Sequence, residues 1–362
     1  MAAHSPSWST ACLDWERRIV AGESLIPCAP LFPEVAQQGM EVFNALRLKD
    51  VLGQPTIGES CRPWLKDFAA TFFGSYNPET GHRLISEYLL TVSKKNTKST
   101  IAAGVMLTVL IHNWREDAEF LILAPTKEAA DNAFKPCQGM IQLDPDLDDL
   151  LHVAPNQRII THRITGATLK VVAADGTSVV GKKATGVLVD ELWEFGKRPA
   201  AQNMLMEATG GIASRPEGFV IYLTTQSEES PAGVFKDKLE YGRKVRDGKI
   251  IAPHFLAVIY EFPKGVLKRK EHLKPENWYI TNPNLGLSVT LEWLKTKYNE
   301  AQEAGEGVLT VWMAKHLDVQ VGISQGASAW AGIKYWMRQA YPELTLQLLI
   351  ERSDVIVCGI DG

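Results

Sequence analysis

A short polar loop at residues 93–100 joins two apolar segments of the chain, at 88–92 and 101–111. A strand, a polar loop, a Lys-Ser pair and a helix form the setting in which backbone N–H groups and a helix N-terminus bind phosphate. In such a loop Lys98 would contact the β- and γ-phosphates of ATP, and the Ser99 hydroxyl would bind Mg²⁺. The other candidate nucleotide contacts in this loop are Ser93, Lys94, Lys95, Asn96, Thr97 and Thr100.

The loop departs from the general phosphate-binding pattern G-x-x-x-x-G-K-[ST] at both glycines. Val92 and Thr97 stand at those positions. If residue 97 needs a positive φ, a β-branched side chain there costs about 1–2 kcal/mol. Taken alone, the segment is equally consistent with a solvated lysine-rich turn.

Two adjacent carboxylates, Asp190 and Glu191, follow a second apolar run at 186–189. An acid at the end of a buried strand is costly unless a positive charge neutralises it. In a nucleotide site Asp190 would hold the Mg²⁺ shell, and Glu191 would orient and deprotonate the attacking water. The alternative is an ordinary Asp-Glu pair at the start of a helix. We expect this strand and the strand at 88–92 to be adjacent.

A third apolar run, at 219–223, ends in Thr224, Thr225 and Gln226. Hydroxyl and amide groups at this place could sense the γ-phosphate and move the segment that follows. Alternatively, the strand merely ends in polar residues. Together the three motifs indicate a P-loop ATPase of the additional-strand type.

Composition excludes several classes of protein. The chain has 362 residues, of which 45% are hydrophobic and 22% charged, so disordered, collagen-like and coiled-coil proteins are excluded. The balance of 38 Lys and Arg against 42 Asp and Glu gives a net charge of −4, which excludes a protein that coats DNA through its overall charge. The apolar run at 101–111 is far shorter than the roughly 18 residues that span a bilayer. The five cysteines show no zinc-site spacing, so we expect reduced thiols.

Alternating apolar runs and helical segments predict an α/β fold with a mainly parallel central sheet and helices on both faces. We also expect a small C-terminal linker subdomain. The predicted boundaries are an N-terminal helical or irregular segment at 1–59, the ATPase core at 60–260, the linker subdomain at 261–353 and a closing apolar strand at 354–362.

The order of these motifs resembles the large terminase subunit of tailed bacteriophages. The resemblance rests on 93–100, 187–191, 224–226 and the closing Gly-Ile-Asp-Gly at 359–362, and it covers nearly the whole chain from about residue 60. It implies an ATPase motor that translocates viral DNA into a procapsid, followed by an RNase H-like nuclease domain. Asp361 would match the first metal-binding Asp of that nuclease. The other nuclease carboxylates would lie beyond residue 362, so we expect no DNA cleavage by this chain.

The resemblance also implies roles for single residues. Lys94 matches a basic residue that contacts the γ-phosphate, and Thr97 replaces the usual glycine. Trp64 supplies the aromatic residue of the adenine-binding region, which here lacks the family's Gln. The implied ligands are ATP and Mg²⁺, and the implied partners are double-stranded DNA, a portal protein and the small terminase subunit. We expect a monomer alone and a homo-oligomeric ring on the portal, in the host cell cytoplasm and without a membrane.

A ring motor needs an arginine from a neighbouring subunit, and Arg215 is our candidate, ahead of Arg158 and Arg163. DNA would be contacted at its phosphates, by the loop at 181–183 or the charged helix at 236–246, although both could be solvated surfaces.

Two alternative functions stay open. One is a superfamily 2-type DNA helicase or translocase, against which the closing strand and the lack of a second helicase core argue. The other is a nucleotide-binding module that does not hydrolyse ATP. Thr97 keeps this second function open, whereas the presence of both Asp190 and Glu191 argues against it.

Overall fold

The computed structural model describes residues 7–173, 184–197, 199–322, 341 and 343–355. An eight-stranded sheet lies at its centre, and all neighbouring strands from β10 to β7 pair in parallel, whereas β6 and β5 add an antiparallel edge. The strand order is β10 (Phe255–Ile259), β3 (Glu87–Thr91), β9 (Phe219–Thr224), β8 (Ala184–Val189), β4 (Glu119–Ala124), β7 (Thr168–Ala173), β6 (Ile159–His162) and β5 (Leu151–Ala154).

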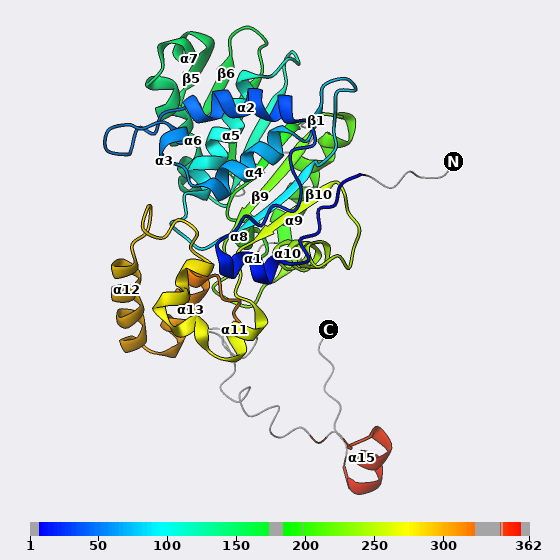
Figure 1. Cartoon of the computed structure of the whole chain (residues 1–362). Helices are drawn as coiled ribbons and strands as arrows, with labels where there is room; N and C mark the ends of the chain where they lie inside the picture. Colours follow the sequence, from blue (N-terminus) through cyan, green and yellow to red (C-terminus); the bar gives the residue numbers. More distant parts are fainter. Residues whose placement is uncertain (1–6, 174–183, 198, 323–340, 342, 356–362) are drawn as a thin grey trace.

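Helices cover both faces of this sheet (Figure 1). One face packs against α2 (Pro33–Ala45), α4 (Pro63–Phe73), α5 (Lys98–Ile111) and α6 (Lys127–Gln142), and the other against α8 (Leu192–Phe195), α9 (Pro199–Gly210) and α10 (Gly233–Arg246). Side chains of β3 alternate between the two cores: Tyr88 and Leu90 belong to the first, and Leu89 to the second. The predicted α/β fold with a mainly parallel sheet is therefore confirmed.

Proline and threonine set the starts of several helices. Pro33 and Pro63 are the first residues of α2 and α4, where a missing N–H costs nothing. The Thr126 hydroxyl accepts a hydrogen bond from the Ala129 N–H and caps α6.

Further elements complete the described part of the chain. They are α1 (Trp15–Ala21), α3 (Ile57–Ser60), the hairpin of β1 (Tyr76–Asn77) and β2 (His82–Arg83), α7 (Pro145–Leu150), η1 (Pro155–Gln157), η2 (Gly211–Ser214), α11 (Lys264–Lys268), η3 (Glu271–Leu273), η4 (Pro275–Ile280), α12 (Leu291–Glu303), α13 (Glu306–Leu317) and α15 (Leu346–Arg352). Figure 1 shows α11, α12 and α13 grouped beside one edge of the sheet. Among the described residues, no helix combines the length and the apolar character that crossing a membrane requires.

The structure differs from the sequence prediction in the strand order. The strands that carry the phosphate loop and the paired carboxylates are not neighbours, because β9 lies between β3 and β8. Two strands of the central sheet, β5 and β10, were not predicted, nor was the hairpin of β1 and β2.

Candidate active site

The three strands that carry the motifs end at the same edge of the sheet. β9 pairs in parallel with β3 on one side and β8 on the other, so that Thr91 lies beside Thr224 and Val189 beside Tyr222. The segments that follow these strands therefore converge at the carboxyl edge, where ligands bind in open parallel sheets.

The loop after β3 enters α5 through two residues with a left-handed backbone. Lys95 has a φ of 70° and Thr97 a φ of 58°. Because glycine adopts this conformation without steric cost, the general motif has glycine at position 97. The loop of this chain thus adopts the positive φ of the motif with a β-branched residue, at a cost of about 1–2 kcal/mol.

Asn96 holds the loop together from inside. Its side chain is fully buried, and Nδ2 donates to the carbonyls of Ser93 at 3.1 Å and Lys94 at 3.3 Å. Ser93 is also fully buried, whereas Lys95 is exposed and Thr100 half-buried. The backbone of residue 96, and not its side chain, is therefore left to contact a phosphate.

Lys98 and Glu191 form an ion pair that is largely removed from water. Lys98 Nζ lies 3.2 Å from Glu191 Oε1, and the two side chains are 7% and 18% exposed. Burial alone lowers the pKa of Lys98, but the charges of Glu191 and Asp190 outweigh it and raise that pKa. Burial likewise raises the pKa of Glu191, whereas Lys98 and Lys94 lower it by more, so Glu191 stays ionised.

Ser99 and Asp190 form the oxygen pair at which a divalent cation fits. Asp190 is 2% exposed, and Ser99 is among the neighbours that lower its pKa. Burial, followed by the charge of Glu191, raises the pKa of Asp190 to about 6. A carboxylate and a hydroxyl are hard oxygen ligands of the kind that Mg²⁺ takes together with substrate phosphates. The described residues contain no cluster of three or more His, Cys, Asp or Glu side chains that could hold a metal alone.

Glu191 is held by an unusual backbone and by a tryptophan. It has a φ of 56° just after β8, a conformation that a non-glycine residue adopts at some cost. The Trp193 Nε1–H donates to Glu191 Oε2, while Lys98 holds the other oxygen. Lys98 and Trp193 thus each fix one carboxylate oxygen of Glu191.

Lys94 brings a second positive charge to this place. Its Nζ lies 5.6 Å from the centre of the Trp193 ring, and burial lowers its pKa. Its backbone N–H donates to the Lys315 carbonyl, near the end of α13, at 2.8 Å. The phosphate loop therefore contacts both α8 and α13.

The three residues at the end of β9 are buried between the loop and α13. Thr224, Thr225 and Gln226 are each at most 1% exposed. The Thr224 hydroxyl accepts a hydrogen bond from the Trp193 N–H at 3.2 Å, and the Gln226 N–H donates to Asp318 Oδ1 at 2.8 Å. Asp318 had no sequence signal, because it is an isolated acid that follows a helix without a motif.

An open cleft of about 600 Å³ runs along the loop. Residues 94–100 and Glu191 line it on one side. Six further lining residues were not predicted from the sequence because no motif marks them: Asp50, Asp131, Asn132, Lys135, Pro136 and Ser288.

Trp64 is not placed as predicted for an adenine contact. Its side chain is 8% exposed and packs edge-on against Tyr260, with ring centres 5.1 Å apart. Its Nε1–H donates to Asn284 Oδ1 at 2.9 Å. Trp64 therefore belongs to the core beneath the loop, and a base cannot stack on it without rearrangement.

Other predicted residues lie away from the cleft or outside the described residues. Arg215 follows η2 and precedes β9, so it lies at the amino edge of the sheet, opposite the phosphate loop. It cannot act on its own site from there, and its role toward a neighbouring subunit stays a prediction. Asp361 and the loop at 181–183 lie outside the described residues.

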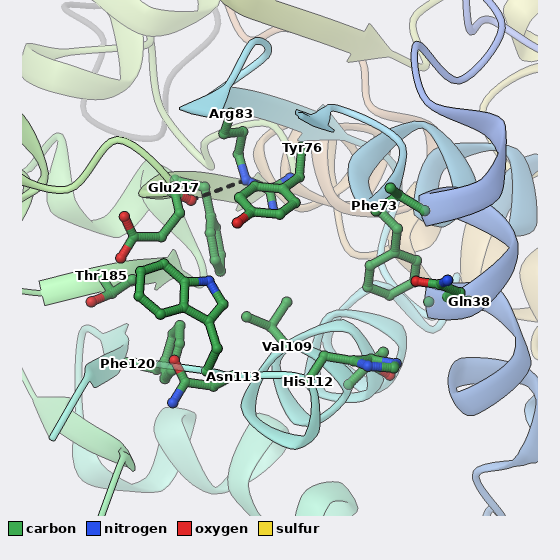
Figure 2. Close-up of a pocket in the computed structure, with 15 residues that line it drawn as sticks. Gln38, Phe73, Tyr76, Arg83, Val109, His112, Asn113, Phe120, Thr185 and Glu217 are labelled. Atoms are coloured by element: carbon green, nitrogen blue, oxygen red, sulfur yellow. Dashed lines mark hydrogen bonds between the residues drawn. The ribbon is translucent and has the colours of Figure 1, made fainter. Parts of the chain in front are cut away.

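A second pocket, of about 210 Å³, lies at this opposite amino edge (Figure 2). Phe120, Thr185 and Glu217 contribute to its walls, next to the aromatic ring of Tyr76. Arg83 crosses its end and donates to the Glu217 carbonyl at 3.2 Å. None of the predicted site residues lines this pocket.

Comparisons with known proteins indicate the family of this chain. A family model described as "Terminase large subunit, ATPase domain" matches residues 63–244. The large terminase subunit of Enterobacteria phage HK97 is 24% identical over 252 residues, which are 69% of this chain and 46% of that protein. The crystal structure of the HK97 bacteriophage large terminase has the same fold, with a TM-score of 0.64 at 19% identity over 79% of this chain and 55% of that one. The chain thus spans about half the length of these relatives.

Proposed function

Because the chain belongs to the family of terminase large-subunit ATPase domains, we propose that it hydrolyses ATP and uses the energy to translocate double-stranded viral DNA into a procapsid. The observation that carries the proposal is the convergence of Lys98, Glu191 and the Ser99–Asp190 pair beside one cleft. The fold would be a P-loop ATPase of the additional-strand type, with a linker subdomain over 261–353.

Binding of ATP would rearrange the Lys98–Glu191 pair. The phosphates would lie along the loop at 93–98, at the N-terminus of α5. Lys98 would then exchange Glu191 for the β- and γ-phosphates, and Lys94 would add a second positive charge. Ser99 and Asp190 are the residues that would hold Mg²⁺, which supplies charge to offset that of the phosphates.

Glu191 would then act as the general base. As the oxygen of a water molecule bonds to the γ-phosphorus, Glu191 accepts its proton, and the bond from that phosphorus to the β–γ bridging oxygen breaks. ADP and inorganic phosphate leave. The lowered pKa of Glu191 keeps it ionised and able to take the proton at neutral pH.

Movement would pass from β9 to the linker subdomain. Thr224, Thr225 and Gln226 lie beside the phosphate loop, and Gln226 is joined to Asp318. A shift at the γ-phosphate would thus displace α13 relative to the sheet. In the host cytoplasm several copies of this chain would form a ring on the portal, with the small terminase subunit as a further partner. In that ring Arg215 would reach the ATP site of a neighbouring copy. Cleavage of DNA would require the full nuclease domain, to which Asp361 would contribute a metal ligand.

The test is Mg-ATP hydrolysis by the purified chain, with and without double-stranded DNA and assembled portal. We expect Glu191→Gln and Lys98→Ala to abolish turnover and Glu194→Gln, on the same short helix, to retain it. If the chain binds nucleotide yet hydrolyses none even on the portal with DNA, the motor function is wrong and a binding module remains.

A further inference from the structure

Two asparagines far from the phosphate loop in sequence lie directly against it. Asn282 and Asn284 follow η4, are separated by Pro283, and are fully buried. Their side chains have no role in the sequence motifs or in the chemistry proposed above. Burying an amide side chain is costly unless its polar atoms are hydrogen-bonded, so the partners of these two residues define what they do.

Asn284 contacts the loop with both its backbone and its side chain. Its N–H donates to Asn96 Oδ1 at 3.0 Å, and Nδ2 donates to the Asn96 carbonyl at 3.2 Å and to Thr97 Oγ1 at 2.7 Å. Its Oδ1 accepts a hydrogen bond from the indole of Trp64. One side chain therefore ties the left-handed residue of the loop to α4.

Asn282 ties the same loop to α13. Its Oδ1 accepts a hydrogen bond from Asn96 Nδ2 at 3.0 Å, and its Nδ2 donates to the carbonyls of Trp278 at 3.0 Å and His316 at 2.8 Å. The three asparagine amides thus form one connected, buried network, and a satisfied network of this kind rigidifies the backbone it contacts.

Thr97 explains why the loop needs this support. A β-branched residue resists the left-handed backbone that this position requires. Here its hydroxyl donates to the Asn96 carbonyl at 2.8 Å and accepts from Asn284. Thr97 thus makes both hydrogen bonds in the left-handed conformation, which a glycine would adopt without cost.

From these contacts we propose that Asn284, supported by Asn282, is a positioning residue that holds the phosphate loop in its nucleotide-binding conformation in place of the missing glycine. The proposal rests on the proposed function only in that the loop binds a nucleotide. It also makes the linker segment after η4 part of the nucleotide site, although no atom of Asn284 needs to touch the nucleotide.

The experiment measures Mg-ADP binding by titration calorimetry for the wild-type chain and for Asn284→Ala, Thr97→Gly and the double variant. We expect Asn284→Ala to weaken binding about tenfold, since two hydrogen bonds to the loop are lost. Thr97→Gly is the background for the rescue, and the double variant should bind within about threefold of Thr97→Gly alone, because glycine no longer needs the support. Asn113→Ala, which removes a half-buried amide at the opposite edge of the sheet, is the control and should bind like wild type.

Three results would overturn the proposal. The first is wild-type affinity in a folded Asn284→Ala, and the second is a double variant as weak as the single one. The third is an equal loss in Asn113→Ala, which would indicate general destabilisation. Circular dichroism and the unfolding midpoint of each variant establish that it is folded. If the wild-type chain binds no nucleotide, the proposed function is wrong. If it binds nucleotide and one of the three results above is found, only the positioning role of Asn284 is wrong.

Discussion

The backbone N–H of Gln226 donates a hydrogen bond to Asp318 Oδ1 at 2.8 Å, which joins the end of β9 to the residue that follows α13. Asp318 is 2% exposed and has a φ of 51°. Its position connects the strand that flanks the phosphate loop with the helix that carries Lys315 and His316. If this helix moves relative to the sheet, either the hydrogen bond breaks or Gln226 moves together with Asp318.

Asp318→Asn should stabilise the protein at pH 8. Burial raises the pKa of Asp318 well above its usual value, and the nearby Glu261 adds to this, whereas the Gln226 N–H, Lys98 and Arg243 lower it. A raised carboxyl pKa makes the folded state bind the proton more tightly, so ionisation costs stability, at about 1.4 kcal/mol for each pKa unit. The gain from Asn should therefore be largest above the folded pKa, shrink as pH falls below it, and vanish only near the usual carboxyl pKa of 3.8. Urea unfolding of both proteins from pH 8 to pH 5 measures it; a less stable variant at pH 8 would contradict this prediction.

Gln226→Leu should raise stability while lowering turnover. Both polar atoms of the Gln226 amide are buried and lack a hydrogen-bond partner among the described residues. Such an unsatisfied group costs about 1–3 kcal/mol, which an apolar side chain of similar size recovers. If the amide is kept for sensing the γ-phosphate, DNA-stimulated hydrolysis should fall in the same variant. Unfolding and ATPase assays on one preparation of the variant measure its stability and its turnover. Unchanged turnover would show that Gln226 does not sense the γ-phosphate.

Lys98→Met should destabilise the nucleotide-free protein by about 3 kcal/mol. It leaves Asp190 and Glu191 buried together without their cation, and breaking a buried ion pair in this way is costly. Glu191→Gln should cost less, because Asp190 still neutralises Lys98. The double variant should therefore be more stable than additivity predicts, by about 1–3 kcal/mol. A double-mutant cycle in urea measures this coupling, and simple additivity would show that the pair contributes nothing.

His316→Phe should make the protein less sensitive to acid. Burial, with the charges of Lys94, Lys315 and Lys95, lowers the pKa of His316 to about 4 from its usual 6.5. The folded state therefore prefers neutral histidine, and stability is full above pH 6.5 and lost as pH falls toward about 4. The full loss corresponds to about 3 kcal/mol. The variant keeps a ring against Trp312 and should lose correspondingly less stability between pH 7 and pH 4.5. Parallel slopes for the two proteins would exclude His316 as the titrating group.

Apolar strand patterns made most of the central sheet predictable. β3, β4, β8 and β9 are short, mainly apolar segments bounded by polar residues, and such segments are typical of strands buried on both faces. The convergence of Lys98, Asp190 and Glu191 at one edge of the sheet was predictable for a similar reason, because the motif residues follow those strands.

Long-range packing decided the features that the sequence did not indicate. The insertion of β9 between β3 and β8 depends on pairing between distant segments, for which no local signal exists. Trp64 has the residue type of a base-stacking side chain, yet its burial is set by Tyr260 and Asn284. Asn282 and Asn284 have the composition of an ordinary turn, and only the folded chain brings them to the loop.

The position of β3 in the sheet determines when the nucleotide site can form during synthesis. β3 leaves the ribosome early, but its two neighbours are residues 219–224 and 255–259. Until β9 emerges, β3 has two unpaired edges and no strand that joins it to β8, and until β10 emerges it keeps one unpaired edge. Residues 282–284, whose asparagines hydrogen-bond to the phosphate loop, emerge later still. Domains with such non-local pairings fold slowly and expose aggregation-prone edges while they do so. Shortened chains that end between residues 226 and 284 should therefore be prone to aggregation, although every catalytic motif of the ATPase is already present in them.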